Sequence, residues 1–221
     1  MTRGLALMLA CTMLSACAAL RSTPPSTPPA SQPQTLPAPH PKRSKETPAA
    51  IRVVAPENEE QKKAQLRQML AKEERDAPIS SDLGYYLDIL QGRLNQSIGP
   101  GMTIARGIDR LTIDLSDRLK FAADGAQLTA ADRNSLVPLT NVLAEYKSTL
   151  VSVRVGAGDT DPEAARLANE RAQTLARYLS ESGVSAKHIV IVSAQTGNAN
   201  GRPLVVELVL EPILRAEPEK R

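Results

Sequence analysis

The chain has 221 residues, and its 27 lysines and arginines nearly balance 24 aspartates and glutamates, which gives a formal net charge of +3 at pH 7. This even balance does not favour nucleic acid as a partner, and one Phe, four Tyr and no Trp leave few rings to stack on bases. The only two cysteines, Cys11 and Cys17, lie near the N-terminus, so the rest of the chain has neither a disulfide framework nor a cysteine-based metal site.

Residues 1–16 have the pattern of an export signal. Arg3 gives the segment a positive start, and the apolar run that follows has the length of ~7–15 residues that is typical of such signals. The run is too short to cross a bilayer, which takes ~20 apolar residues. We therefore expect this segment to direct export and then to be removed.

The stretch LSAC, residues 14–17, closes the apolar run and resembles the lipobox of bacterial lipoproteins. The resemblance implies that Cys17 is acylated and becomes the first residue of the mature chain. Cleavage of an ordinary signal near Ala18 or Ala19 is the alternative. Two or more acyl chains give stable anchoring, at about 0.8 kcal/mol per buried methylene. Because Ala18 is not the Asp that this class associates with inner-membrane retention, the resemblance implies an outer-membrane anchor and a protein that faces the periplasm.

Residues 17–56 form a proline-rich segment. Ten of the seventeen prolines of the chain lie here, mixed with Ser, Thr, Ala and Gln. Such a composition cannot bury enough apolar surface to offset the entropy of ordering, and it favours extended polyproline II. At ~3.1 Å per residue, roughly thirty residues reach up to about 90 Å. We predict a disordered spacer between the lipid and a folded head.

Residues 57–77 are rich in strong helix formers with charges of both signs. Leu66, Met69 and Leu70 make an apolar stripe at helical spacing, but the stripe is too narrow to bury a helix deeply. We therefore expect an exposed charged helix, with a partner-binding or self-associating helix as the alternative.

From residue 80 the pattern becomes that of a packed α/β domain. The runs at 188–194 and 203–212 are almost continuously apolar, as in strands that are buried on both faces. The order of the elements predicts an α/β sandwich with a mixed sheet over 80–212, followed by a charged tail at 213–221. The expected helices are 80–98, 129–146 and 162–182, and the expected strands are 102–105, 111–115, 150–155, 188–194 and 203–212.

Two segments carry a family resemblance, KFAADGAQLTAADRNSLVPLTNVLAEYKSTLVSV and LANERAQTLARYLSESGVSAKHIVI. Together they are similar to the OmpA-like peptidoglycan-associating domain, over about residues 84–211. The resemblance implies a domain with a mixed β-sheet and two main helices. The matching positions are Phe121 with Leu128, Leu143 with Tyr146, and Arg171-Ala172 with Leu179 and Gly183-Val184 downstream.

The resemblance also implies a ligand. In this family an Asp in a loop and an Arg on the next helix hold the free end of a diaminopimelate residue of the peptidoglycan stem peptide. That end is a zwitterion, so an acid and a base a few ångströms apart can bind both charges. Arg171 matches the arginine, with a plain surface arginine as the competing interpretation. The acid is Asp159, which needs fewer deletions in the alignment, or Asp161, which also has the position of a helix N-cap before Pro162.

Catalysis finds no support in the sequence. It contains no Ser, His and acid constellation, no metal-ligand cluster and no phosphate-binding glycine loop. His188 stands at the start of a strand, where a satisfied or exposed histidine is the expected interpretation. We predict that the protein is not an enzyme and that it has no cofactor and no metal.

Two functional hypotheses follow. The first is an outer-membrane lipoprotein whose head binds peptidoglycan non-covalently and tethers the membrane to the wall, with no nucleic-acid partner. The second is a structural lipoprotein of an envelope-spanning secretion or conjugation machine, with other envelope proteins as partners. The second is motivated by the short loops and by the family's NRRVE segment, which reads GRPLVVEL here and leaves only Arg202 nearby.

Overall fold

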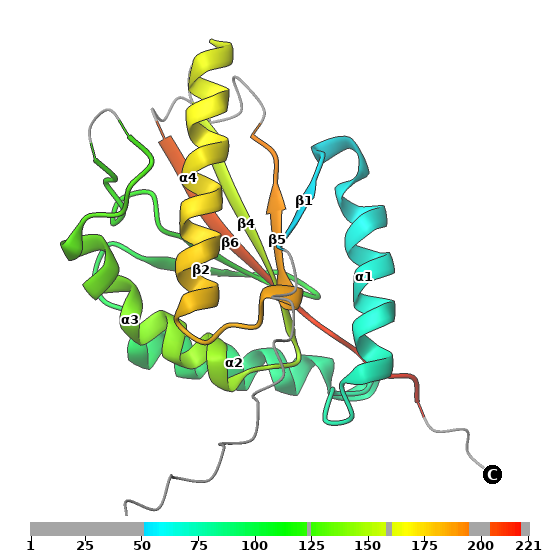
Figure 1. Cartoon of the computed structure of the whole chain (residues 1–221). Helices are drawn as coiled ribbons and strands as arrows, with labels where there is room; N and C mark the ends of the chain where they lie inside the picture. The colour runs from blue at the N-terminus through cyan, green and yellow to red at the C-terminus, as the bar shows by residue number, and fades with distance from the viewer. Residues whose placement is uncertain (1–50, 123–124, 158–160, 195–203, 218–221) are drawn as a thin grey trace, which may run out of the picture. The chain divides into compact units, whose positions relative to one another are not determined.

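The computed structural model describes residues 51–122, 125–157, 161–194 and 204–217. These residues belong to one folded unit, Lys45–Arg221 (Figure 1). The strands are β1 (Arg52–Val54), β2 (Thr103–Arg106), β3 (Leu111–Asp114), β4 (Thr149–Ala157), β5 (Ile189–Val192) and β6 (Leu204–Pro212). The helices are α1 (Glu59–Glu73), α2 (Leu83–Ser97), α3 (Ala130–Glu145) and α4 (Pro162–Glu181).

The strands form one mixed sheet of six strands in the order β1-β5-β4-β6-β3-β2. β4 and β6 are the long central pair, and they run antiparallel from Thr149 opposite Pro212 to Ala157 opposite Leu204. β5 lies parallel to β4, β1 lies parallel to β5, and β3 and β2 extend the other side by antiparallel pairing. The predicted α/β fold with a mixed sheet is therefore confirmed, and every strand expected from residue 102 onward is present.

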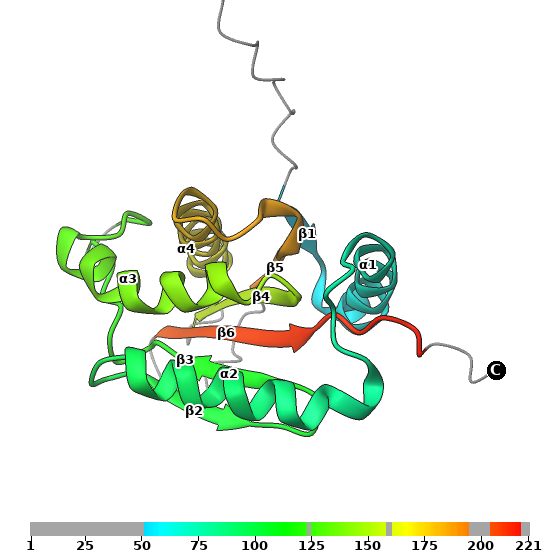
Figure 2. The same ribbon diagram turned by 90° about the horizontal axis from the view of Figure 1, so that it is seen from below.

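The face of the sheet that α2, α3 and α4 cover is called the front face here, and it holds the main core. Figure 2 shows α3 and α4 on one side of β4 and β5 and α1 on the other. The strand residues of the front face alternate, as expected for side chains that point to one side of a sheet. The buried core includes Leu87, Leu90, Ile113, Leu136, Leu139, Val151, Val153, Leu175, Leu179, Ile191, Leu208 and Leu210.

Local sequence signals fix the ends of the helices on this face. Thr129 and Asp132 form a reciprocal capping box at the start of α3, which satisfies two backbone N–H groups. Pro162 occupies the first turn of α4, where its missing N–H is not needed. Gly183 follows α4 with φ of +103°, a conformation in which L side chains are strained.

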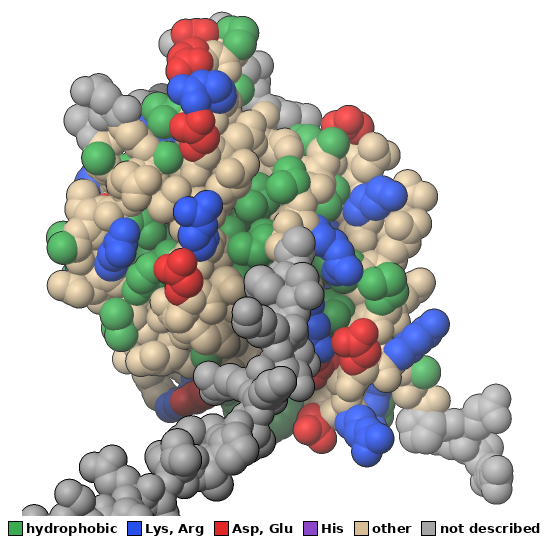
Figure 3. All heavy atoms as spheres, in the orientation of Figure 1, with side chains coloured by type: hydrophobic (Ala, Val, Ile, Leu, Met, Phe, Trp, Pro, Cys, Tyr) green, Lys and Arg blue, Asp and Glu red, His purple; other side chains and the backbone are tan. Residues whose placement is uncertain are grey.

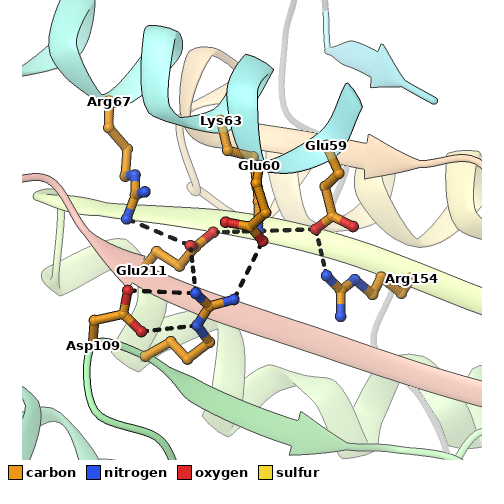
Figure 4. A network of polar contacts seen from close by, with 8 residues as sticks. Glu59, Glu60, Lys63, Arg67, Asp109, Arg154 and Glu211 are labelled. Carbon is orange, nitrogen blue, oxygen red and sulfur yellow. Dashed lines mark hydrogen bonds and ion pairs between the residues drawn. The ribbon is translucent and has the colours of Figure 1, made fainter. Parts of the chain in front are cut away.

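The back face, which is the opposite face of the sheet, is covered by α1. A small apolar cluster joins the two and consists of Val54, Leu66, Leu70, Leu150, Val190 and Ile213. Charged side chains also take part in this contact (Figure 4). Lys63 on α1 is fully buried, and its Nζ lies 2.8 Å from Glu59 Oε1, 3.0 Å from Glu60 Oε1 and 2.9 Å from Glu211 Oε2.

The ion pairs of the back face extend beyond Lys63. Glu211 on β6 is also fully buried, and Arg67 Nη1 lies 3.4 Å from its Oε1. Arg110 reaches the same carboxylate oxygen at 3.9 Å, and Arg154 pairs with Glu59. Burial alone would lower the pKa of Lys63, but its contacts with Glu211 and Glu59 outweigh this and raise the pKa. Lys63 is therefore held in its charged form.

The structure corrects the expectation of an exposed charged helix at 57–77. α1 exposes one side but packs the other against the sheet, because a buried lysine adds to a stripe that looked too narrow when only apolar residues were counted. The folded unit also extends beyond 80–212. β1 lies outside that range, and Ile213 is fully buried although it falls in the predicted charged tail.

Candidate functional site

Helix α4 carries two of the predicted site residues. Asp161 is its N-cap, and its Oδ1 accepts a hydrogen bond of 3.0 Å from the backbone N–H of Glu163. Arg171 lies in the middle of the helix, next to Ala172, which is buried against the core. Arg171 itself is half-buried. Long side chains on a helix point back toward its N-terminus, so the arginine leans toward the end where Asp161 lies.

The segment before α3 holds the Arg171 side chain. Its Nε donates a hydrogen bond of 3.1 Å to the carbonyl oxygen of Gly125. Its guanidinium carbon lies 5.4 Å from the centre of the Phe121 ring, within range of a cation–π contact. No carboxylate among the residues that the structure describes lies within ion-pair distance of Arg171. One edge of the guanidinium is thus fixed by the protein, and its charge is not neutralised by these residues.

Phe121 has an unusual backbone. It has φ of +46°, and among the described residues it alone shows a positive φ without being a glycine. A bulky residue in this conformation is strained, and such strain persists where the surroundings hold the residue firmly. The ring is buried in the core, and a turn beside it is closed by bonds from Ala122 N to Gln127 O (3.0 Å) and from Gly125 N to Ala122 O (3.1 Å). With this backbone conformation, the Phe121 ring and the Gly125 carbonyl both contact Arg171.

Burial lowers the pKa of the Arg171 guanidinium, because partial removal from water disfavours the charge. Arginine nevertheless stays protonated in proteins. A planar cation with uncompensated charge is suited to a carboxylate, which it can bind through two parallel hydrogen bonds. The site can therefore receive the anionic end of a ligand.

The predicted acids are placed differently. Asp161 is described, and its carboxylate serves at least the helix cap. Its backbone lies about 15 Å from that of Arg171 along the helix axis, from a rise of ~1.5 Å per residue. Asp159, Arg202 and Cys17 lie outside the described residues. The pairing of Arg171 with Asp159 or Asp161 across a ligand remains a prediction.

His188 lies in the interior of the folded unit, next to a glutamate. It is buried, and its Nε2 lies 3.1 Å from Glu74 Oε1, beyond the end of α1. Burial lowers the pKa of His188, and Glu74 partly offsets this effect. Among the described residues, no group of His, Cys, Asp and Glu is arranged to hold a metal ion. In the same part of the chain, no helix has the length and apolar character needed to cross a membrane.

Two contacts of the site were missed from sequence. Phe121 matched the family pattern but was not connected with Arg171, although it is the one phenylalanine of the chain. The Gly125 carbonyl is a backbone group, so no residue type signals it. The signal that could have indicated Phe121 is its place in the family pattern, in the segment before the helix that carries Arg171.

The fold places this chain in the class of α/β domains in which helices cover a mixed sheet. The model of the OmpA family matches residues 120–204, which include Phe121, Gly125 and Arg171.

Individual proteins resemble a larger part of the chain. A protein described as "Probable lipoprotein YiaD", from Escherichia coli strain K12, is 28% identical over 150 residues, which are 61% of this chain and 67% of the relative. The solved structure of a putative MotB-like protein from Desulfovibrio vulgaris matches with a TM-score of 0.50 and 13% identity, over 66% of this chain and 99% of that one. It supports the fold.

A further match is the OmpA-like domain of FopA1 from Francisella tularensis subsp. tularensis SCHU S4. It has a TM-score of 0.38 and 22% identity, over 52% of this chain and 83% of that one.

Proposed function

We propose that this protein is a lipoprotein of the bacterial outer membrane whose OmpA-like domain binds peptidoglycan non-covalently and tethers the membrane to the wall. The anchor would be Cys17, and the segment 17–56 would span the distance to the head. The OmpA-family match and the resemblance to a probable lipoprotein support a role in the cell envelope. The role is binding and not catalysis.

One observation carries the proposal, the state of Arg171. The guanidinium is held by a ring contact with Phe121, whose backbone is strained, and by a hydrogen bond to a backbone carbonyl. No described carboxylate pairs with it. A surface arginine without a function would instead point into water. An arginine that is held in this way, partly out of water, gains most from an anion brought by a ligand.

The mechanism is recognition of a zwitterion. Arg171 would bind the free carboxylate of a diaminopimelate stem peptide, and Asp159 or Asp161 would bind the adjacent ammonium group. Phe121 and the Gly125 carbonyl would keep the guanidinium in place before the ligand arrives, so that less side-chain entropy is lost on binding. Recognition of both charges would distinguish this end from a peptide end that carries only one of them.

A sedimentation assay with purified sacculi tests the proposal. We expect Arg171→Ala to weaken binding by at least about tenfold, since a charge-assisted contact is worth more than ~1.4 kcal/mol. Arg177→Ala is the matched control, because Arg177 is an exposed arginine on the same helix. Equal sedimentation of the wild type, Arg171→Ala and Arg177→Ala would rule out this site.

The same assay separates the two acids. Asp161→Asn should keep the N-cap, because asparagine caps helices as well as aspartate does. If Asp161 only caps the helix, this variant will bind like the wild type and Asp159→Asn will lose binding. The reverse result assigns the ligand to Asp161. Full binding by both variants would contradict recognition of the ammonium group.

A structural role in an envelope-spanning machine is the second candidate. The observation that favours it is the part of the folded unit outside 120–204, where α1 is fixed to the back face by buried ion pairs. The ring contact of Arg171 with Phe121 and its hydrogen bond to the Gly125 carbonyl both lie within 120–204. Crosslinking in cells separates the two roles, because a machine subunit gives discrete protein adducts and a wall tether gives mainly muropeptide adducts.

A further inference from the structure

A groove runs between β1 and α1, at the edge of the sheet. It has a volume of about 540 Å³. Figure 3 shows hydrophobic side chains next to Lys and Arg side chains over the region of β1 and α1. The residues that line the groove come from one stripe of α1 and from β1, and they include Val53, Lys62, Leu66, Met69 and Arg52.

The groove exposes large apolar side chains. Val53 is 59% exposed and Met69 is 50% exposed, while Leu66 lies buried at the base of the groove. Methionine is flexible and polarizable, and it adapts to varied partner side chains. Covering these exposed apolar side chains with a partner would lower the free energy.

The backbone of β1 is also open on this side. β1 is the last strand of the sheet, and among the described residues it pairs with β5 alone. The N–H of Ser193 donates to the carbonyl of Val54, so Val54 faces β5. Because neighbouring residues of a strand direct their backbone groups to opposite sides, the N–H and C=O of Val53 face away from the sheet. They are available to one more strand.

The charges of the groove have one sign. Among the described residues, Arg52 and Lys62 are its charged lining residues, and none of the lining residues is acidic. Neither of the two has an ion-pair partner within the described ranges. This contrasts with the back face a few residues away, where every charged side chain of α1 that is buried is paired. The groove therefore favours an acidic occupant.

We propose that the groove binds an extended, acidic segment of another envelope protein, which adds a strand to the sheet at β1. Alternate apolar side chains of the segment would contact Met69, Val53 and Leu66, and its carboxylates would pair with Arg52 and Lys62. The lining residues from Asn58, the N-cap of α1, to Met69 cover about 16 Å at ~1.5 Å per residue. An extended strand fills that length with about five residues.

A second copy of this chain is a poorer occupant. Pairing of β1 with β1 of another copy would bring the positive charges of both grooves together around one axis, with no carboxylate of either groove to neutralise them. Like charges at such close range are unfavourable. The short strand also gives few backbone contacts, so the occupant must supply side-chain contacts that a second β1 lacks. The acidic segment satisfies both conditions.

Site-specific photocrosslinking in intact cells tests this inference with the full chain. A photoreactive residue replaces Val53 or Met69, and the control replaces Val137, an exposed valine on α3. We expect the first two positions, and not the control, to give a protein adduct whose crosslinked peptide, mapped by mass spectrometry, is acidic and extended. Reversal of both charges, Arg52→Glu with Lys62→Glu, should reduce the adduct by at least about tenfold.

A backbone variant gives an independent readout. Val53→Pro removes the outward N–H but leaves the bonds between β1 and β5, and it should reduce the adduct at Met69, whereas Val53→Thr should not. Adducts with this chain itself, with lipid, or with a segment that is not acidic would overturn the proposal, and so would the absence of adducts. Binding to sacculi through Arg171 is unaffected in each case, so the two proposals fail separately.

Discussion

The two faces of the sheet are stabilised by different interactions. The front face buries a large set of aliphatic side chains from three helices, whereas the back face has a small apolar cluster and a group of buried charges around Lys63 and Glu211. Aliphatic packing tolerates exchange of one side chain for another of similar volume. A buried ion pair does not tolerate the loss of one partner, because the other charge is left without compensation.

This difference bears on what each face can do. The front face is covered by α3 and α4, which lie in the segment that matches the OmpA-family model, and Arg171 on α4 lies against the ring of Phe121. The back face holds α1 through specific charges, which fix one register of the helix against the sheet. That register determines where Met69 and Lys62 lie in the groove beside β1.

The largest expected effect on stability comes from removing a charge that is buried at the back face. Lys63→Ala leaves the buried Glu211 with only the longer contacts to Arg67 and Arg110, so the free energy of unfolding should fall by about 3–5 kcal/mol in urea titrations. Lys72→Ala, at an exposed position of α1, should have almost no effect. The double variant Lys63→Met with Glu211→Leu should recover most of the loss. No recovery would mean that the charges themselves are needed.

The next effect compares the loss of one leucine from the front core with the loss of one leucine from the back face. Leu175→Ala in the front core should lower the free energy of unfolding by about 2–5 kcal/mol and weaken the whole domain in one transition. Leu66→Ala on α1 should act more locally. Hydrogen exchange is expected to rise in α1 and to stay unchanged in α4. Equal exchange increases in both helices would show that the two faces unfold as one unit.

The smallest effect concerns His188, which contacts Glu74 beyond the end of α1. Its pKa is lowered in the folded protein from the usual 6.5, so below that pH the unfolded chain binds more protons. The stabilisation is fully present above about pH 6.5 and is lost as the pH falls through the folded pKa. Urea midpoints between about pH 8 and pH 5 should decrease, and His188→Gln should flatten the trend. A midpoint that rises on acidification would mean that the imidazolium pairs strongly with Glu74 and that the pKa is raised.

The sequence predicted the front face well, because aliphatic residues at periods of two and 3.6 mark strands and helices directly. Pro162 begins α4 and Gly183 follows its end as expected, and Thr129 is the N-cap of α3. The back face could not be predicted in the same way. Lys63 looks like a solvated lysine until Glu211, which is distant in sequence, is known to lie opposite it.

The candidate site also has features that the sequence predicted and features that it did not. Arg171 was predicted because a resemblance marked it; the residue is half-buried, and its role in binding a ligand stays a prediction. The role of Asp161 as an N-cap followed from its place before Pro162 and is confirmed. The ring of Phe121 and the carbonyl of Gly125 depend on a turn with a strained backbone, and periodicity carries no information on such a turn.

Val54 and Ile213 lie in the same apolar cluster, although one stands near the start of the folded unit and the other near its end. Residues from near both ends of the folded unit therefore pack together in one cluster. A fragment trimmed at either end would lose the same cluster and release α1. A domain closed in this way can also be joined to neighbouring segments on both sides without disturbing the site on α4.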